Sequence, residues 1–342
     1  MSPALVIFIG GICMIPRFVN RRLLCRFLFP LTALSLEHCF ARPFRSPTQA
    51  ELKYTIPKTT AQKIRNRIDK TKNNKAPGID LINGKILKNL PPKAIRLTTI
   101  IYNAILRIQY FPKPCKLAQI KMLAKPGKDP HQTASYRPIS LFPVFSKILE
   151  KIIYYRIKTI IEIKKTNSGT LIWIEKQTFR DRANAQAYQQ NNNSTRKQAI
   201  LHSHFMDIEK AFGEINHESL LQTIRKQFPE QIHHLIKSYL SSRIFVIKIK
   251  DTYSEVKDIK AGVPQGSVLG LILYTLYTAN IPTTTNSTLL TFADDTPTLV
   301  RHTNPERAVK LLQEHITKIE KWLEEKQIKT NSNKCNHITF TL

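Results

Sequence analysis

The sequence is poor in acidic residues and in cysteine, and it has no long apolar run. Its 342 residues include 24 aspartates and glutamates against 53 lysines and arginines, which gives a formal net charge of +29. No apolar run reaches the roughly 18–20 residues that span a bilayer, so a transmembrane protein is excluded. The five cysteines are too few for a disulfide scaffold and too scattered for a zinc-binding C-x-x-C set. A hydrophobic content of 42% excludes a disordered chain and predicts a folded protein.

The positive charge is concentrated in one part of the chain. Residues 51–165 hold 25 lysines and arginines and six acids, whereas residues 166–342 hold 22 and 17. A segment so dominated by one sign predicts contact with a polyanion, and nucleic acid is the leading candidate because neutralised phosphates release counterions. The alternative is a lysine-rich solvated surface, although protein surfaces usually mix both signs.

Two stretches differ in character from the rest. Residues 1–45 carry an apolar run, Leu5–Ile15, that is followed by arginines, and Glu37 is the only acid before Glu51. We expect an unstructured or non-native leader; the alternative is a mitochondrial transit peptide, which is typically rich in Arg and poor in acids. Residues 166–200 contain a run of Gln and Asn and show no period, which predicts a loop or a variable insertion.

Helical periodicity predicts several helices along the chain. One is expected over Thr60–Lys70, one after Pro91-Pro92 and one over Ser146–Ile161. The apolar residues at helical spacing after Pro91-Pro92 are Leu97, Ile100, Ile101, Ala104, Ile105 and Ile108. Asn304-Pro305-Glu306 is a helix start signal, and the stripe predicted to be buried behind it is Val309, Leu312, Ile316, Ile319 and Leu323.

Strands are expected between these helices. Alternating or continuous apolar runs place them at Leu117–Ala124 and Phe205–Asp207, and as a pair at 245–250 and 255–261. Residues 290–300 have the pattern of a hairpin with two aspartates at its tip. Helices and strands interleave without the regularity of βαβ units, which predicts the α+β class.

Three short passages carry the candidate chemistry. They are Asp207–Phe212 (Asp-Ile-Glu-Lys-Ala-Phe), Ala261–Gly270 (Ala-Gly-Val-Pro-Gln-Gly-Ser-Val-Leu-Gly) and Phe292–Asp295 (Phe-Ala-Asp-Asp). Taken singly, each is explained by local structure, since Asp often follows a strand, Pro-Gln-Gly forms a turn and Asp-Asp suits a hairpin tip. All three in this order and at these distances are hard to obtain by chance.

With four further passages, this set resembles the reverse transcriptases of non-LTR (LINE-type, jockey-like) retrotransposons. The further passages are Lys75–Asp80, Lys125–Asp129, Ser135–Leu141 and Asn333–Phe340. The resemblance implies an RNA-directed DNA polymerase with the right-hand fold of fingers and palm. The palm is then an antiparallel sheet backed by helices, and the thumb is absent or incomplete because the chain ends at Leu342. We expect residues 46–204 to form a basic fingers-like region and residues 205–342 to form the palm.

The resemblance makes Asp207 and Asp294 catalytic metal ligands, with Asp295 as a weaker third. Nucleotidyl transfer needs a nucleophilic 3′-hydroxyl and a stabilised pentavalent phosphate, and two Mg²⁺ ions about 3.5–4 Å apart provide both. Carboxylate oxygens suit this hard ion, and Mn²⁺ is the expected substitute. The aspartates converge only if the strand that ends at Asp207 and the hairpin that bears Asp294 are neighbours.

The same resemblance implies that six further residues bind substrate. They are Phe212, Gln265, Gly266, Arg137, Lys125 and Lys334. The phenylalanine would exclude a ribose 2′-hydroxyl, and the Gln-Gly pair would lie along the incoming nucleotide. The arginine and the first lysine would contact the triphosphate, and the second lysine would protonate the leaving pyrophosphate. A core phenylalanine, a plain turn and surface lysines are the structural alternatives. The implied partners are an RNA template, a DNA primer and deoxynucleoside triphosphates, with no membrane.

Departures from the family pattern favour an alternative, a decayed copy that retains only RNA and DNA binding. Gly213 stands where the family has Asp, Leu271 stands where proline is usual, and Lys176–Arg180 is a shortened form of a family passage. Pro297 falls in the expected outgoing strand, where its missing N–H is a liability. A third hypothesis is a metal-dependent nuclease. It has little support because no motif positions a His or Lys as the general base.

The chain also has no room for the endonuclease that such elements carry, so target cleavage is expected to come from another chain. We expect the protein in the nucleus or in a cytoplasmic ribonucleoprotein.

Overall fold

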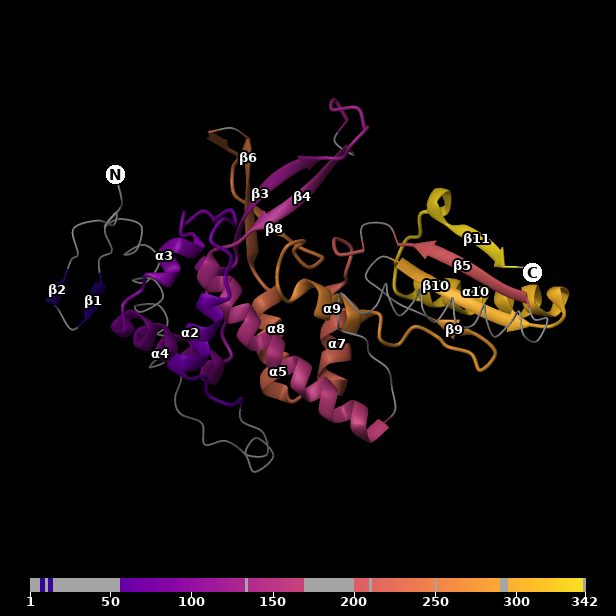
Figure 1. Ribbon diagram of the computed structural model, residues 1–342, viewed down its shortest axis with the longest axis horizontal. Helices are drawn as coiled ribbons and strands as arrows, with labels where there is room; N and C mark the ends of the chain where they lie inside the picture. The colour runs from indigo at the N-terminus through magenta and orange to yellow at the C-terminus, as the bar shows by residue number, and fades with distance from the viewer. Residues whose placement is uncertain are drawn as a thin grey trace. The chain divides into compact units, whose positions relative to one another are not determined.

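The computed structural model describes residues 56–132, 135–168, 200–208, 211–249, 251–289 and 295–340, with the short strands β1 (Ile7–Ile9) and β2 (Ile12–Met14) (Figure 1). Most of the predicted leader and of the predicted insertion lies outside these residues. The chain forms two compact units. Unit 1 comprises Met1–Ile157, Ile224–Lys260 and Gln265–Leu269, and unit 2 comprises Lys158–Thr223, Ala261–Pro264 and Gly270–Leu342. The predicted division at residue 205 stays a prediction.

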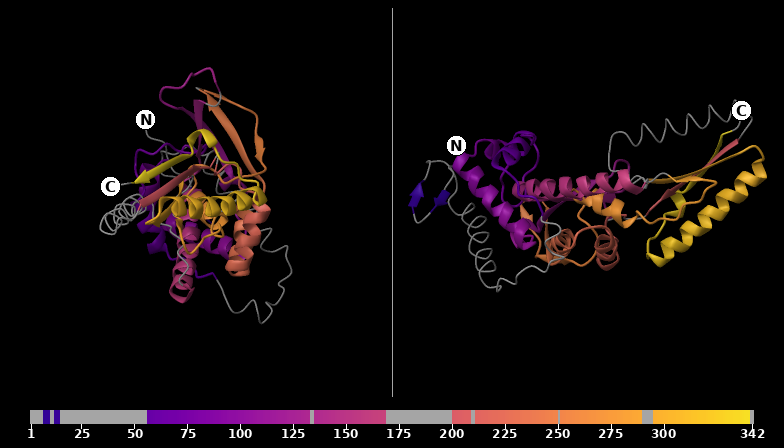
Figure 2. Two further views of the ribbon diagram at one scale, coloured as in Figure 1. Left: turned by 90° about the vertical axis from the view of Figure 1, so that its right-hand side faces the viewer. Right: turned by 90° about the horizontal axis from the view of Figure 1, so that it is seen from below.

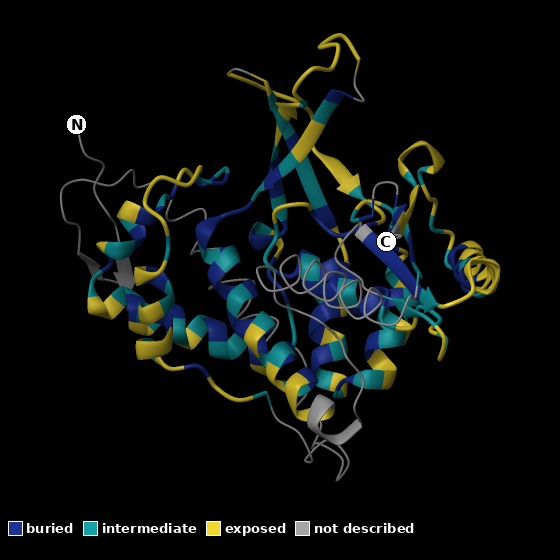
Figure 3. Cartoon of the chain, turned by 45° about the vertical axis from the view of Figure 1, so that its right-hand side comes forward, coloured by how far each residue is buried: buried dark blue, intermediate teal, exposed yellow. Residues whose placement is uncertain are grey.

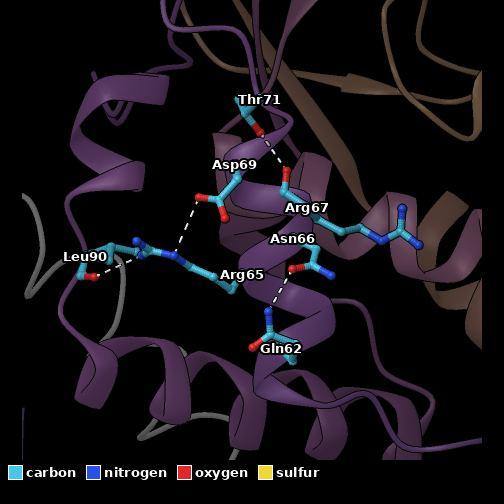
Figure 4. Close-up of polar contacts among 7 residues, drawn as sticks. All are labelled: Gln62, Arg65, Asn66, Arg67, Asp69, Thr71 and Leu90. Atoms are coloured by element: carbon cyan, nitrogen blue, oxygen red, sulfur yellow. Dashed lines mark hydrogen bonds and ion pairs between the residues drawn. The ribbon is translucent and has the colours of Figure 1, made fainter.

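The helices of unit 1 form where local signals are strong. They are α2 (Ala61–Asp69), α3 (Gly84–Lys88), α4 (Pro92–Ile108), the first part of α5 (Val144–Ser168) and α8 (Glu230–Leu240). Helix α2 begins after Thr60, whose side chain accepts from the Lys63 N–H. Figure 4 shows Arg65 of α2 between the Asp69 carboxylate at 3.5 Å and the Leu90 carbonyl at 3.4 Å. These contacts tie the helix to the segment that precedes α4.

The sheet of unit 1 is five-stranded within the described residues. Its strands are β3 (Leu117–Ala124), β4 (Tyr136–Leu141), β6 (Arg243–Ile249), β7 (Thr252–Tyr253) and β8 (Lys257–Ile259). The order is β4-β3-β6-β7, with β8 also paired to β6. Strands β3 and β6 are parallel, and the other pairs are antiparallel. The predicted strand pair at 245–250 and 255–261 is confirmed as β6 and β8.

The sheet of unit 2 is antiparallel and is backed by a helix. Its order is β11 (Asn336–Phe340), β5 (Ile200–Asp207), β10 (Asp295–His302) and β9 (Thr288–Leu289). Helix α10 (Pro305–Glu325) begins after the N-cap Asn304 and runs along the sheet in the right-hand view of Figure 2. Met206 of β5 packs against Ile319, Trp322 and Leu323 of α10. The two sheets with their helices confirm the α+β class.

Two further helices lie close to the predicted motifs. Helix α7 (His217–Gln227) follows the Asp207–Phe212 passage, and α9 (Gly270–Tyr277) follows the Pro-Gln-Gly turn. Helix α9 continues through Leu271, so the missing proline leaves the helix intact. In the described part of the chain, no helix is long and apolar enough to cross a membrane.

Three expectations about side-chain burial and strand geometry need correction. The buried residues of α4 are Ile95, Thr98, Tyr102, Ile105 and Leu106, and Ile100 is 65% exposed. Val309 of the predicted α10 stripe is also exposed. Pro297 does not interrupt β10, which runs through it opposite Phe205 of β5.

Candidate active site

Asp207 is the last residue of β5, the strand that lies between β11 and β10 in the sheet of unit 2. Its carbonyl oxygen accepts from the Asn331 N–H at 2.9 Å, which fixes the backbone at the end of the strand. Its side chain is 20% exposed. A short carboxylate on an anchored strand end, partly open to solvent, is suited to bind a cation.

The ladder between β5 and β10 brings the predicted acidic positions together. Asp295 is the residue opposite Asp207 in the register, so the strand that ends at one aspartate is adjacent to the strand that begins at the other. Opposed residues of an antiparallel pair have Cα atoms about 4.5–5.5 Å apart. Asp294 lies outside the described residues. The two strands are therefore adjacent, as predicted. The structure shows this at Asp295, the residue that follows Asp294.

Lys334 lies beside Asp207. It belongs to the short 3₁₀ turn η4 (Ser332–Lys334), which precedes β11. Its Nζ donates to Oδ2 of Asp207 at 3.0 Å, across 127 residues of sequence. The lysine side chain is 65% exposed, so the pair faces solvent. A cation at this carboxylate offsets its charge and places an acidic proton next to it.

The passage after β5 is held by a backbone clasp within unit 2. The Val263 N–H donates to the Phe212 carbonyl at 2.7 Å, and the Gly262 N–H donates to the Ile215 carbonyl at 2.9 Å. Gly262 has φ +79°, and a Cβ there would lie 2.7 Å from the Phe212 oxygen, so only glycine fits. The Phe212 ring, half-buried, lies 5.2 Å from the Tyr274 ring. The clasp fixes the phenylalanine five residues after Asp207.

His217 completes this clasp and was not among the predicted site residues. Its Nε2 is 2.7 Å from the Gly262 carbonyl, to which it donates. The only signal in the sequence is its place five residues after Phe212, at the start of the following helix. Gly213, the departure from the family pattern, lies in the same turn but is not among the glycines with positive φ. The backbone at Gly213 is thus open to an L-residue.

In unit 1, Lys125 and Arg137 lie at the same end of the hairpin of β3 and β4. Lys125 follows β3, and its N–H donates to the Ser135 carbonyl at 2.8 Å, two residues before Arg137. Arg137 lies opposite Leu123 in the register and is exposed. The turn beyond them is exposed and is coloured yellow in Figure 3. The hairpin therefore presents basic groups near its tip, as phosphate contacts require.

Gln265 and Gly266 contact the other end of β4. The Ser140 N–H donates to the Gln265 carbonyl at 3.0 Å. Gly266 has φ +104°, and a Cβ there would lie 2.9 Å from the Ser140 oxygen, so the backbones approach too closely for a side chain. Both residues are exposed. Within unit 1, β4 thus links the Gln-Gly turn to the basic hairpin.

The acidic positions fit Mg²⁺ in chemical kind. Hard carboxylate oxygens on adjacent strands are the ligands that this ion prefers. The described residues alone form no group of three or more His, Cys, Asp or Glu that could hold a metal ion. Asp294 is not among them, and Asp295 is described only by its backbone, so Asp207 is the ligand candidate whose side chain is defined.

Comparisons with known proteins show the family of the chain. The family model described as "Reverse transcriptase (RNA-dependent DNA polymerase)" matches residues 123–340. The RNA-directed DNA polymerase from mobile element jockey of Drosophila melanogaster is 33% identical over 312 residues, which is 86% of this chain and 33% of that protein. The probable RNA-directed DNA polymerase from transposon X-element of Drosophila melanogaster is 37% identical over 275 residues, covering 79% of this chain and 30% of that protein.

A solved structure, apo telomerase from Candida tropicalis, shares the fold. The TM-score is 0.50 with 13% sequence identity, over 66% of this chain and 44% of that one. The family match and this shared fold define a protein with a reverse transcriptase domain. The chain belongs to the reverse transcriptase family, and it is similar to the enzymes of jockey and related non-LTR retrotransposons. It spans about a third of the length of these curated relatives.

Proposed function

We propose that the chain carries out RNA-directed DNA synthesis, adding deoxynucleotides to the 3′-hydroxyl of a DNA primer on an RNA template. The observation that supports this most directly is the end of β5. There Asp207 lies opposite Asp295 in the register and 3.0 Å from Lys334. Family membership supports the same reaction, since the matched relatives are named RNA-directed DNA polymerases.

In this proposal Asp207, Asp294 and Asp295 hold two Mg²⁺ ions, for which Mn²⁺ substitutes. When bound, these ions activate the primer hydroxyl and stabilise the charge on the phosphate. The residues of the chain orient the reactants around them. Asp207, anchored through its carbonyl to Asn331, fixes one ligand on a strand end. The Lys334 ammonium group lies beside the Asp207 carboxylate. In this proposal it donates its proton to the leaving pyrophosphate.

The substrate contacts in this proposal are those that the resemblance to the family implies. In unit 2 the clasped Phe212 excludes a 2′-hydroxyl and selects deoxynucleotides. In unit 1 Arg137 and Lys125 bind the triphosphate, and the fixed Gln265-Gly266 turn lies along the incoming nucleotide. The missing side chain of Gly266 lets this turn lie against the Ser140 backbone, which fixes its position.

The test is primer extension on an RNA template with Mg²⁺, comparing the unmutated chain with Asp207→Asn. The substitution keeps the size of the side chain but removes the charge that binds the metal. We expect incorporation to fall roughly 100-fold or more, since metal-bound charge stabilisation contributes several kcal/mol. Asp294→Ala, at the ligand position outside the described residues, is tested in the same assay.

Asp258→Asn is the matched control, because Asp258 is an exposed aspartate on β8 and loses the same charge. It is expected to retain full incorporation. Equal, near-zero incorporation by the unmutated chain and by Asp207→Asn would exclude the polymerase. Retained binding of an RNA–DNA duplex by both would then support the decayed copy.

A further inference from the structure

A buried glutamate lies under the Gln-Gly turn of unit 1. Glu150 is in α5 and is 0% exposed. Its Oε2 accepts from the Val268 N–H at 2.7 Å and lies 3.4 Å from the Leu269 nitrogen, 118 and 119 residues away in the sequence. Its Oε1 lies 3.4 Å from the Ser146 hydroxyl, one helical turn earlier. Both carboxylate oxygens are therefore engaged.

The surroundings of Glu150 act on its carboxyl group in opposite directions. Burial raises the pKa of Glu150, whereas the Arg243 guanidinium and the two backbone N–H groups act in the opposite direction. Arg243 is itself 0% exposed, donates to the Tyr239 carbonyl at 3.1 Å and lies over the Tyr239 and Phe142 rings. An apolar side chain at this position would leave the buried Arg243 without this opposite charge. It would also accept from neither backbone N–H group.

The segment Gln265–Leu269 is thus fixed at both ends. At its start, Ser140 of β4 donates to Gln265 and leaves no room for a side chain at Gly266. At its end, Glu150 of α5 holds the N–H groups of Val268 and Leu269. The backbone of Gln265 is anchored in this way, whereas its side chain is exposed. A rigid backbone that presents a free polar side chain is the arrangement expected of a preorganised binding segment.

From this geometry we infer that Glu150 is a positioning residue for the nucleotide-binding segment Gln265–Leu269. The inference rests on the proposed function, because it takes this segment to lie along the incoming nucleotide. Glu150 touches neither substrate nor metal. It acts through the backbone of Val268 and Leu269, so its loss affects the binding of the deoxynucleotide more than that of the primer–template.

The first test uses Glu150→Gln, which keeps the size and one acceptor oxygen but removes the charge. We expect KM for the deoxynucleotide to rise about tenfold, the effect of weakening a charge-assisted hydrogen bond. The KM for the primer–template stays near that of the unmutated chain, and the unfolding midpoint shows that the variant is folded at the assay temperature. Glu162→Gln is the matched control, since Glu162 is an exposed residue of the same helix. It leaves all three values unchanged.

The second test is amide hydrogen exchange in Gln265–Leu269, which needs no polymerase activity. Glu150→Gln is expected to speed exchange at Val268 and Leu269 at least threefold, while exchange elsewhere in α5 is unchanged. Unchanged exchange in the folded variant overturns the inference, whatever the activity. Faster exchange with an unchanged KM for the deoxynucleotide also overturns it, because Glu150 then only stabilises the fold.

Failure of the proposed function gives a different result. In that case the unmutated chain and Glu162→Gln extend no primer and bind no deoxynucleotide in the presence of primer–template and Mg²⁺. The positioning role then falls with the function, while hydrogen exchange still shows whether Glu150 holds the segment.

Discussion

Unit 1 buries four charged side chains almost completely. Asp80, Lys116, Glu150 and Arg243 are each at most 4% exposed. Burial lowers the pKa of Lys116 to about 8, with Arg243 adding to the shift, and its Nζ donates to the Ser241 carbonyl at 3.0 Å. Such groups are costly unless they are paired or hydrogen-bonded, so each holds a particular piece of backbone in place.

Asp80, the last residue of the Lys75–Asp80 passage, is only partly satisfied. Its Oδ1 accepts from the Ile82 N–H at 3.3 Å, and its buried Oδ2 has no hydrogen-bond partner among the described residues. Burial raises its pKa to about 6, against opposing effects of backbone hydrogen bonds and Lys147. The folded protein therefore binds more protons than the unfolded chain between about pH 4 and pH 6. The stability contributed by Asp80 falls as pH rises through this window and is constant above it.

Asp80→Asn removes this penalty and keeps the oxygen that accepts from Ile82. At pH 7.5 we expect the variant to be more stable than the unmutated chain by roughly 1–3 kcal/mol, the size of a shift of about two pKa units. At pH 4 the advantage disappears. Urea unfolding at the two pH values measures it. Asp69→Asn, at an exposed residue of α2, is the control and gains no such pH-dependent stability. An Asp80→Asn advantage that is equal at both pH values contradicts the raised pKa.

Sequence patterns do not reveal residues of this kind. Glu150 stands among Lys and Ile in a helix and is typical of a solvated position, because its backbone partners are 118 residues away. Lys334 was predicted at the site only through the resemblance to a family, and its contact with Asp207 spans 127 residues. Local signals predict elements, whereas such long-range contacts form only when the chain is folded.

Secondary-structure elements with strong local signals were predicted well. Strand β3 has the predicted bounds, Leu117–Ala124, and the N-caps Thr60 and Asn304 begin their helices as expected. The parallel pairing of β3 with β6 was not predicted, since it joins strands more than a hundred residues apart. Period and capping are local properties, and strand order is not.

Helix α4 shows why an apolar helix is hard to orient from its sequence. Apolar residues lie on most of its sides, so the period fits more than one face. The chain buries the face that carries Tyr102, whose hydroxyl donates to the Phe145 carbonyl at 2.8 Å. This choice leaves Ile100 exposed. The buried face is thus the one that also makes a polar contact outside the helix.

Two matched substitutions in α4 test this orientation. Ile105 is 1% exposed and Ile100 is 65% exposed, and both are isoleucines in the interior of one helix. Ile105→Ala is expected to lower the free energy of unfolding by about 2–4 kcal/mol through lost burial and a cavity. Ile100→Ala is expected to change it by about 0.5 kcal/mol or less. Urea unfolding measures both, and similar losses in the two variants would place both faces of α4 in the core.

At the scale of the whole molecule, charge is distributed unevenly, and this distribution determines where the chain attracts nucleic acid. Residues 51–165 carry 25 of the 53 lysines and arginines but only six of the 24 acids. In this segment Lys121 and Lys128 are exposed on and beside the β3–β4 hairpin, near the exposed Arg137. By contrast, exposed lysines of α10, such as Lys310 and Lys318, alternate with glutamates. A phosphate backbone is attracted to the first region more than to the second.

The salt dependence of binding distinguishes these two regions. Affinity for an RNA–DNA duplex is expected to fall steeply with salt, because each phosphate contact releases counterions. Replacing Lys121 and Lys128 by Gln removes up to two contacts and lowers the slope of log K against log salt by about 1–2. Replacing Lys310 and Lys318 by Gln removes the same formal charge and leaves the slope unchanged. Equal slopes for the two double variants would mean that net charge alone, rather than a basic surface of residues 51–165, draws the chain to nucleic acid.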